Sequence, residues 1–94
     1  MTQPKQARAV VTYSGNVQGV GFRMTAVRLV QGASITGWVQ NQPNGDVVLD
    51  AEGEQSALNA YLKRIEQEMG HHISAAQVDW RTATQRYQSF EIRY

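Results

Sequence analysis

The chain has 94 residues, 41% apolar and 18% charged, which is the balance of one small globular domain. A net charge of +1 gives it no overall attraction to nucleic acid or to an anionic membrane, and the lack of cysteine excludes disulfides and thiol catalysis. No apolar run approaches the roughly 20 residues of a membrane span, and the polar start lacks the apolar stretch of a signal peptide. We therefore expect one cytoplasmic domain over residues 1–94, with residues 1–6 flexible.

Along the chain, apolar alternation and helical spacing predict five strands and two helices. In order, they are a strand over 9–13, a helix over 22–33, strands over 36–42 and 47–52, a helix over 55–69, and strands over 76–82 and 90–94. The Pro-Asn-Gly-Asp turn at 43–46 makes a hairpin of the second and third strands, and Gly70 is expected to cap the second helix. This order predicts an α+β, ferredoxin-like fold of the split β-α-β type. It is a two-layer sandwich, β-α-β-β-α-β plus a short C-terminal strand, with two helices on one face of an antiparallel sheet.

A glycine-rich segment, residues 15–21, joins the first strand to the first helix and is followed by Arg23. Glycines let backbone N–H groups turn inward, and the free amides and dipole of a helix start favour an oxyanion. Arg23 can add a bidentate contact to phosphate. The segment lacks the Lys-Ser/Thr pair of an ATP loop, and Met24 stands where a dinucleotide fingerprint has its third glycine. From the residues alone, an oxyanion site and a glycine-rich turn without a ligand both stay open.

Two motifs bear on this choice: Gly15 to Arg23 (GNVQGVGFR) and Gly37 to Asn41 (GWVQN). Together they resemble the acylphosphatase family, and the likeness extends over nearly the whole chain. The resemblance implies hydrolysis of acyl phosphates to a carboxylate and inorganic phosphate, without metal or cofactor. It also implies that Asn41 orients the attacking water, while Arg23 and a row of backbone amides hold the phosphoryl group. These amides belong to Gln18, Gly19, Val20, Gly21 and Phe22.

The residue types fit this chemistry. A carboxylate leaving group has a conjugate acid of pKa about 4, so it needs no strong general acid. Neither motif contains Asp, Glu or His, so charge on the phosphoryl group must be stabilised by preorganised donors. Asn41 can accept a hydrogen bond from water and donate one to phosphate, but it is too weak a base to deprotonate water. We therefore expect the proton of the water to end on a phosphate oxygen.

Other functions stay open: a non-catalytic phosphate-binding or regulatory module, and a carbamoyl-phosphate-processing domain like that of hydrogenase-maturation carbamoyltransferases. RNA binding would need an aromatic-basic strand motif that the sequence lacks. We expect a monomer that binds inorganic phosphate or sulfate at the site and has no nucleic-acid or membrane partner. The sequence shows no acyl pocket, so broad specificity is expected, with Asn16 affecting substrate preference and Gln42-Pro43 altering the rim of the site.

Outside the two motifs, other polar and aromatic residues favour structural roles. His71-His72 lacks the spacing of metal ligands and predicts a solvated loop. Trp38 and Trp80 lie in predicted strands and are expected to be core or half-buried sheet residues. Among the tyrosines, only Tyr13, just before the glycine-rich segment, is placed to touch the site.

Overall fold

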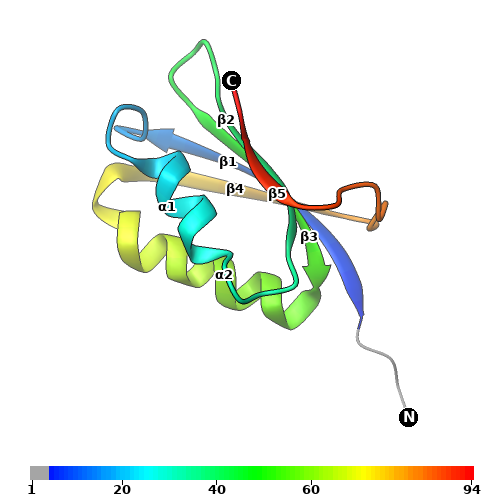
Figure 1. Ribbon diagram of the computed structural model, residues 1–94. Coiled ribbons are helices and arrows are strands. Elements are labelled where there is room, and N and C mark those ends of the chain that lie inside the picture. The colour runs from blue at the N-terminus through cyan, green and yellow to red at the C-terminus, as the bar shows by residue number, and fades with distance from the viewer. Residues whose placement is uncertain (1–4) are drawn as a thin grey trace.

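The computed structural model describes residues 5–94, which form two helices packed on one face of a five-stranded sheet (Figure 1). The elements are β1 (Gln6–Gly15), α1 (Phe22–Leu29), β2 (Thr36–Asn41), β3 (Val47–Glu54), α2 (Gln55–Met69), a 3₁₀ turn η1 (Gly70–His72), β4 (Ile73–Arg81) and β5 (Phe90–Arg93). The strand order is β4-β1-β3-β2-β5, so the predicted α+β class and split β-α-β order are confirmed. Neither helix in the described part of the chain is long and apolar enough to cross a membrane.

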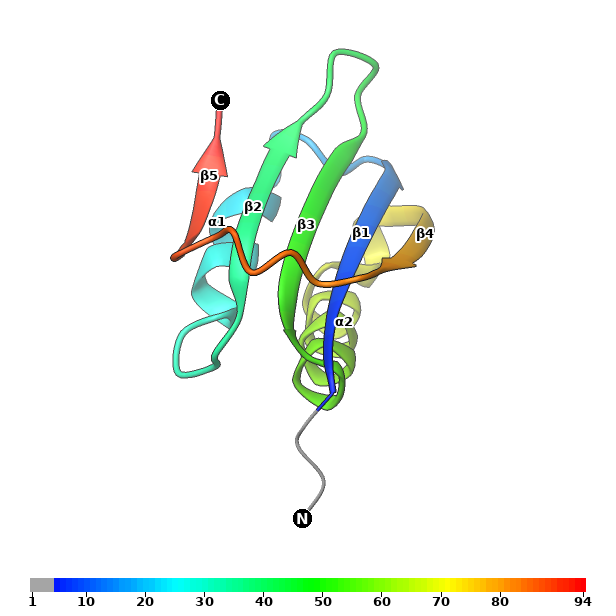
Figure 2. The same ribbon diagram turned by 90° about the vertical axis from the view of Figure 1, so that its right-hand side faces the viewer.

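One strand departs from the expected antiparallel sheet. The pairs β1–β3, β1–β4 and β2–β3 are antiparallel, but β5 runs parallel to β2, with Gly37 opposite Phe90 and Gln40 opposite Arg93. The strand before it in the chain, β4, lies at the opposite edge of the sheet, so the connection to β5 must cross the whole sheet. Residues 82–89 make that crossover, and in Figure 2 they pass over the face of the sheet opposite the helices. The sheet is therefore mixed.

Several element boundaries differ from the prediction; β4, for example, begins at Ile73 rather than at residue 76. α1 ends at Leu29 rather than at residue 33, because a turn follows and Gly32 has a left-handed φ of +81°. Gly70 is the C-cap of α2, as predicted, but its φ is −58° rather than left-handed, and the chain continues directly into η1. Gln6, expected to be flexible, is already part of β1, opposite Glu54. Residues 1–4, expected to be flexible as well, lie outside the described residues.

The core lies between the sheet and the two helices. Alternate residues of β1 (Ala9, Val11 and Tyr13) are buried there. Tyr61 of α2 is also buried, and its hydroxyl donates a 2.6 Å hydrogen bond to the carbonyl of Ala26 in α1. Burial raises the pKa of Tyr61, so this donor stays protonated at neutral pH. The contact joins the two helices and keeps α1 over the sheet.

On the opposite face, the crossover buries two carboxylates of β3. Asp50 accepts hydrogen bonds from Arg8 Nε at 3.0 Å and Nη2 at 2.6 Å. Glu52 accepts from the backbone N–H groups of Thr84 at 2.7 Å and Gln85 at 2.8 Å, and from the Thr84 hydroxyl. Burial raises the pKa of Glu52, but these hydrogen bonds and the charge of Arg8 outweigh burial and lower it. The buried carboxylates thus hold the crossover that carries β5 to its place beside β2.

Candidate active site

The glycine-rich loop, residues 15–21, runs from the end of β1 to the start of α1. Gly19 and Gly21 have φ of +76° and +80°, and a Cβ at either position would meet no atom within 4 Å. Glycine is therefore favoured at these two positions because of the left-handed backbone conformation, and not because a side chain would clash with a neighbour. Val17 is completely buried and holds the middle of the loop against the core. The loop is thus anchored on its core side by Val17, while Gly19 and Gly21 are exposed to solvent.

The loop presents backbone donors that have no protein acceptor. Among residues 5–94, no hydrogen bond from the backbone N–H groups of residues 18–21 to a protein oxygen is found. The first hydrogen bond of α1 runs from the N–H of Thr25 to the carbonyl of Gly21 at 3.0 Å, so the N–H groups before Thr25 lack a helical partner. Free amides at a helix start carry positive potential and favour an anion.

Arg23 and Asn41, predicted as the two catalytic side chains, line one small cavity of about 100 Å³. Its lining residues are Val17, Gly19, Gly21, Phe22, Arg23, Met24, Asn41, Ile92 and Tyr94. Asn41 ends β2 and, by strand alternation, shares the helix-facing side with buried Val39. Within the described residues, Arg23 has no ion pair and the side chain of Asn41 has no hydrogen-bond partner. One guanidinium and one carboxamide are therefore free to act on a ligand.

Two of the five predicted amide positions lie outside the cavity lining. Val20 is half-buried and packs against the core. The side chain of Gln18 turns away from the cavity and donates to the carbonyl oxygens of Gln42 at 2.8 Å and Asp46 at 2.9 Å. Of the predicted amide residues, Gly19, Gly21 and Phe22 reach the lining.

The apolar side of the cavity was not predicted. Met24, Ile92 and Tyr94 contribute to the lining, and the Arg23 guanidinium lies 5.2 Å from the centre of the Tyr94 ring. Met24 and Tyr94 are largely exposed, at 67% and 93%. Their position gives the cavity an apolar rim beside its cation. The alternation of Phe90, Ile92 and Tyr94 was the available signal, but it did not reveal which strand β5 would join.

The remaining candidates take structural positions. Tyr13 is buried with its ring centre 4.8 Å from that of Phe22, and it is absent from the lining of the small cavity. Trp38 is half-buried and donates to the Tyr87 hydroxyl at 3.3 Å, whereas Trp80 is 42% exposed. The rings of His71 and His72 lie 4.0 Å apart. Residues 5–94 contain no group of three His, Cys, Asp or Glu side chains that could hold a metal ion.

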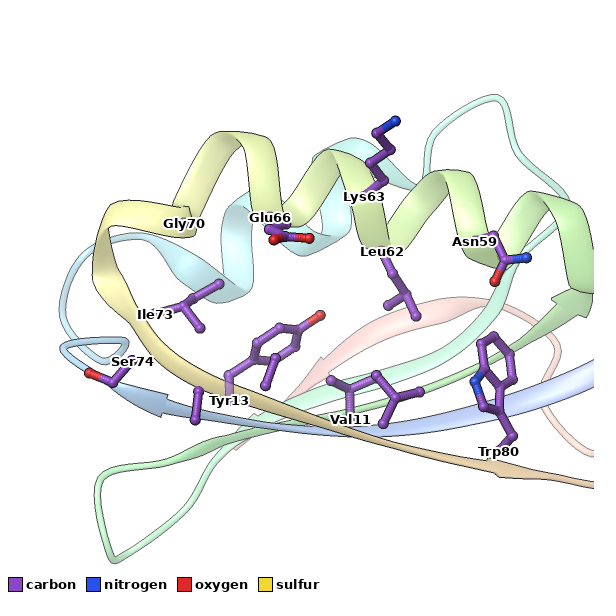
Figure 3. A pocket seen from close by; sticks show the side chains of 13 residues that line it. Val11, Tyr13, Asn59, Leu62, Lys63, Glu66, Gly70, Ile73, Ser74 and Trp80 are labelled. Carbon is purple, nitrogen blue, oxygen red and sulfur yellow. The ribbon is translucent and has the colours of Figure 1, made fainter.

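A larger groove, of about 750 Å³, lies between α2 and β4 (Figure 3). Apolar side chains such as Val11, Leu62 and Trp80 point into it, and Lys63 and Glu66 stand on its helical wall. Its lining contains neither Arg23 nor Asn41 nor any residue of the glycine-rich loop. Arg23, Asn41 and the free amides of the glycine-rich loop therefore gather at the smaller cavity and not at this groove.

Comparison with known proteins identifies the family of the chain. A family model described as Acylphosphatase matches residues 9–92. The chain is 34% identical over 89 residues to an acylphosphatase of Salinibacter ruber, with 94% of both proteins covered. It is 39% identical over 94 residues to one of Geobacter metallireducens, with 93% of this chain and 95% of that protein covered. The crystal structure of acylphosphatase from Bacillus subtilis matches with a TM-score of 0.84 at 25% identity, over 94% of this chain and 99% of that one. Because the family model spans most of the chain, and because close sequence relatives and a structure of the same fold are acylphosphatases, the chain belongs to the acylphosphatase family.

Proposed function

We propose that the chain, a hydrolase by its family, cleaves acyl phosphates in the cavity formed by the glycine-rich loop, α1 and β2. Arg23 and the loop amides hold the phosphoryl group, and Asn41 orients the attacking water. One observation carries this assignment. In the described residues, an Arg without an ion pair, an Asn without a side-chain partner and exposed loop glycines border the same cavity of about 100 Å³.

The size of the cavity supports a grip on the phosphoryl end of the substrate. Sites for drug-sized ligands typically enclose about 300–1,000 Å³. A cavity of about 100 Å³ suits a small anion and leaves the acyl group at the rim, beside Met24 and Tyr94. Specificity for the acyl group should therefore be broad, with a preference for apolar groups.

The reaction needs few groups from the protein. The oxygen of water attacks phosphorus, the bond to the acyl oxygen breaks, and the carboxylate leaves with the electron pair. The proton of the water passes to a phosphate oxygen, so the products are a carboxylate and inorganic phosphate. Arg23 and the amides stabilise charge on the phosphoryl oxygens, and they are already in place before the reaction. Asn41 can hold the water in line because its side chain makes no hydrogen bond to another group within residues 5–94.

The test is hydrolysis of benzoyl phosphate by the wild type and by Arg23→Ala and Asn41→Ala, with inorganic phosphate as a competitive inhibitor. Matched controls are Arg64→Ala and Asn59→Ala, which change exposed residues of α2. Arg23→Ala should lower both phosphate affinity and turnover, the latter on the order of 10²–10³-fold. Asn41→Ala should lower turnover by about 10²-fold with inhibition by phosphate nearly unchanged. Loss of phosphate affinity with normal turnover in Asn41→Ala would reverse the two roles.

The same assay separates the alternative of a phosphate-binding module. Such a module would bind inorganic phosphate or sulfate without turning over benzoyl phosphate or carbamoyl phosphate. Turnover of carbamoyl phosphate alone would favour the carbamoyl-phosphate-processing domain. The monomeric state and the cytoplasmic location stay predictions, to be checked by sedimentation and by fractionation of cells.

A further inference from the structure

The side chain of Gln18 ties the glycine-rich loop to the β2–β3 hairpin. Its Nε2 donates to the carbonyl oxygens of Gln42 at 2.8 Å and Asp46 at 2.9 Å, which uses both N–H groups of the amide. The two acceptors belong to one turn, because the N–H of Gln42 donates to the Asp46 carbonyl at 2.8 Å. A single side chain thus fastens the loop to both arms of the hairpin.

These two hydrogen bonds of Gln18, here called the Gln18 tie, lie next to Asn41, the residue proposed to hold water. Gln42 follows Asn41 directly, and Asp46 precedes Val47, the residue paired with Asn41 across β2 and β3. Both acceptors of Gln18 are therefore one residue from the Asn41–Val47 pair. On the other side, Gln18 immediately precedes Gly19, which lines the cavity.

We propose that Gln18 is a positioning residue, which sets the distance between the anion-binding amides and Asn41. The proposal rests on the proposed function, because the distance matters only if Asn41 holds a water that attacks a phosphoryl group bound by the amides. Buried Val17 anchors the loop in the core. Among residues 15–21, Gln18 alone makes a side-chain hydrogen bond to the hairpin. Since the side chain of Gln18 does not line the cavity and both of its N–H groups are occupied, this side chain acts through Asn41 and not on the substrate. A displacement of about 1 Å between reacting groups can cost on the order of 10²-fold in rate.

Two substitutions remove the tie in different ways. Gln18→Met keeps the length of the side chain without its donors, and Gln18→Glu places a carboxylate against two carbonyl oxygens. Gln77→Met, at an exposed position of β4, is the matched control. We expect kcat for benzoyl phosphate to fall about 10- to 100-fold in Gln18→Met, while the inhibition constant of phosphate changes less than about threefold. Gln18→Glu should recover part of its kcat relative to Gln18→Met as the pH is lowered, because a protonated carboxyl regains one donor.

A double-mutant cycle tests whether Gln18 acts through Asn41. In an Asn41→Ala background, Gln18→Met should cost less than about threefold in kcat, since no water-holding group remains to be displaced. Equal losses in both backgrounds, or loss of phosphate affinity with unchanged kcat, would overturn the role of Gln18. Thermal unfolding shows whether Gln18→Met folds, and if it does not, Gln18→Glu at neutral pH, where the carboxylate donates no hydrogen bond, provides the cycle. Absence of turnover by the wild type would instead refute the proposed function, and normal turnover in the single variant Asn41→Ala would refute the role of Asn41, so these failures are distinguishable.

Discussion

Two glycines with left-handed φ should respond very differently to alanine. Gly37 lies within β2 with φ of +144°, and a Cβ there would come within 1.8 Å of the Asp50 carbonyl oxygen and 2.8 Å of its carbon. Gly21 precedes α1 with φ of +80°, and a Cβ there would meet nothing within 4 Å. Gly21→Ala therefore changes only the backbone preference, whereas Gly37→Ala also forces two strands apart.

The magnitudes follow from this geometry. A left-handed conformation costs a residue with a Cβ about 1–2 kcal/mol, so Gly21→Ala should lower the free energy of unfolding by about that amount. Gly37→Ala should cost about 3 kcal/mol or more, because strain adds to an overlap that backbone atoms cannot relieve cheaply. The overlap also falls on Asp50, which is buried and bonded to Arg8.

Urea unfolding of both variants, followed by circular dichroism, measures these differences. A loss for Gly37→Ala no larger than that for Gly21→Ala would refute the argument from close approach. Gly21→Ala should in addition weaken inhibition by inorganic phosphate, because Gly21 helps to shape the amide loop. Gly45→Ala is the control for left-handed strain alone, since Gly45 has φ of +97°, open space around its Cβ position and no place in the cavity lining.

Four further outcomes are expected. Arg23→Lys should keep part of the phosphate affinity but lose on the order of 10²-fold in turnover, because an ammonium lacks the planar fork of donors; steady-state kinetics of benzoyl phosphate measure both. The pKa of Glu52 is lowered from 4.5, so its carboxylate should stabilise the fold above about pH 4.5 and lose that effect as the pH falls through the lowered value. Thermal unfolding between pH 3 and 6 should therefore depend less on pH in Glu52→Gln than in the wild type. Met24→Ser should lower kcat/KM by about threefold for benzoyl phosphate and not for acetyl phosphate, since it removes apolar surface from the rim. Turnover by the wild type should be unchanged by a chelator, and a loss on chelation would indicate a metal in the reaction.

Local sequence patterns predicted the elements that form the site. Apolar alternation in β1 and the change of period after Phe22 located a strand, a loop and a helix start in the right order. Asn41 could be placed on the helix-facing side because it follows Val39 by two residues, the period of a strand. The prediction that Arg23 and Asn41 act in one site came from the resemblance of the two motifs to the acylphosphatase family, and both residues line the cavity.

The crossover could not be predicted, because no local pattern encodes it. In the predicted strand, Asp50 and Glu52 alternate with apolar residues, which predicts that they face solvent. In the structure both are buried, at 1% and 4% exposure. Residues 82–89 cover them without regular secondary structure of their own. Their interaction with the crossover joins residues more than 30 positions apart, beyond the reach of any periodicity.

The wall of the site depends on this unpredicted contact. Residues 82–89 carry β5 from the β4 edge to the other edge of the sheet, beside β2, and so bring Ile92 and Tyr94 to the cavity. Arg23 and Asn41 come from the predicted part of the fold, while the apolar rim comes from the end of the chain. The phosphoryl-binding half of the site could therefore be inferred from motifs, whereas the acyl side required the tertiary structure. Substitutions that loosen Glu52 should accordingly disturb the choice of acyl group before they disturb the grip on phosphate.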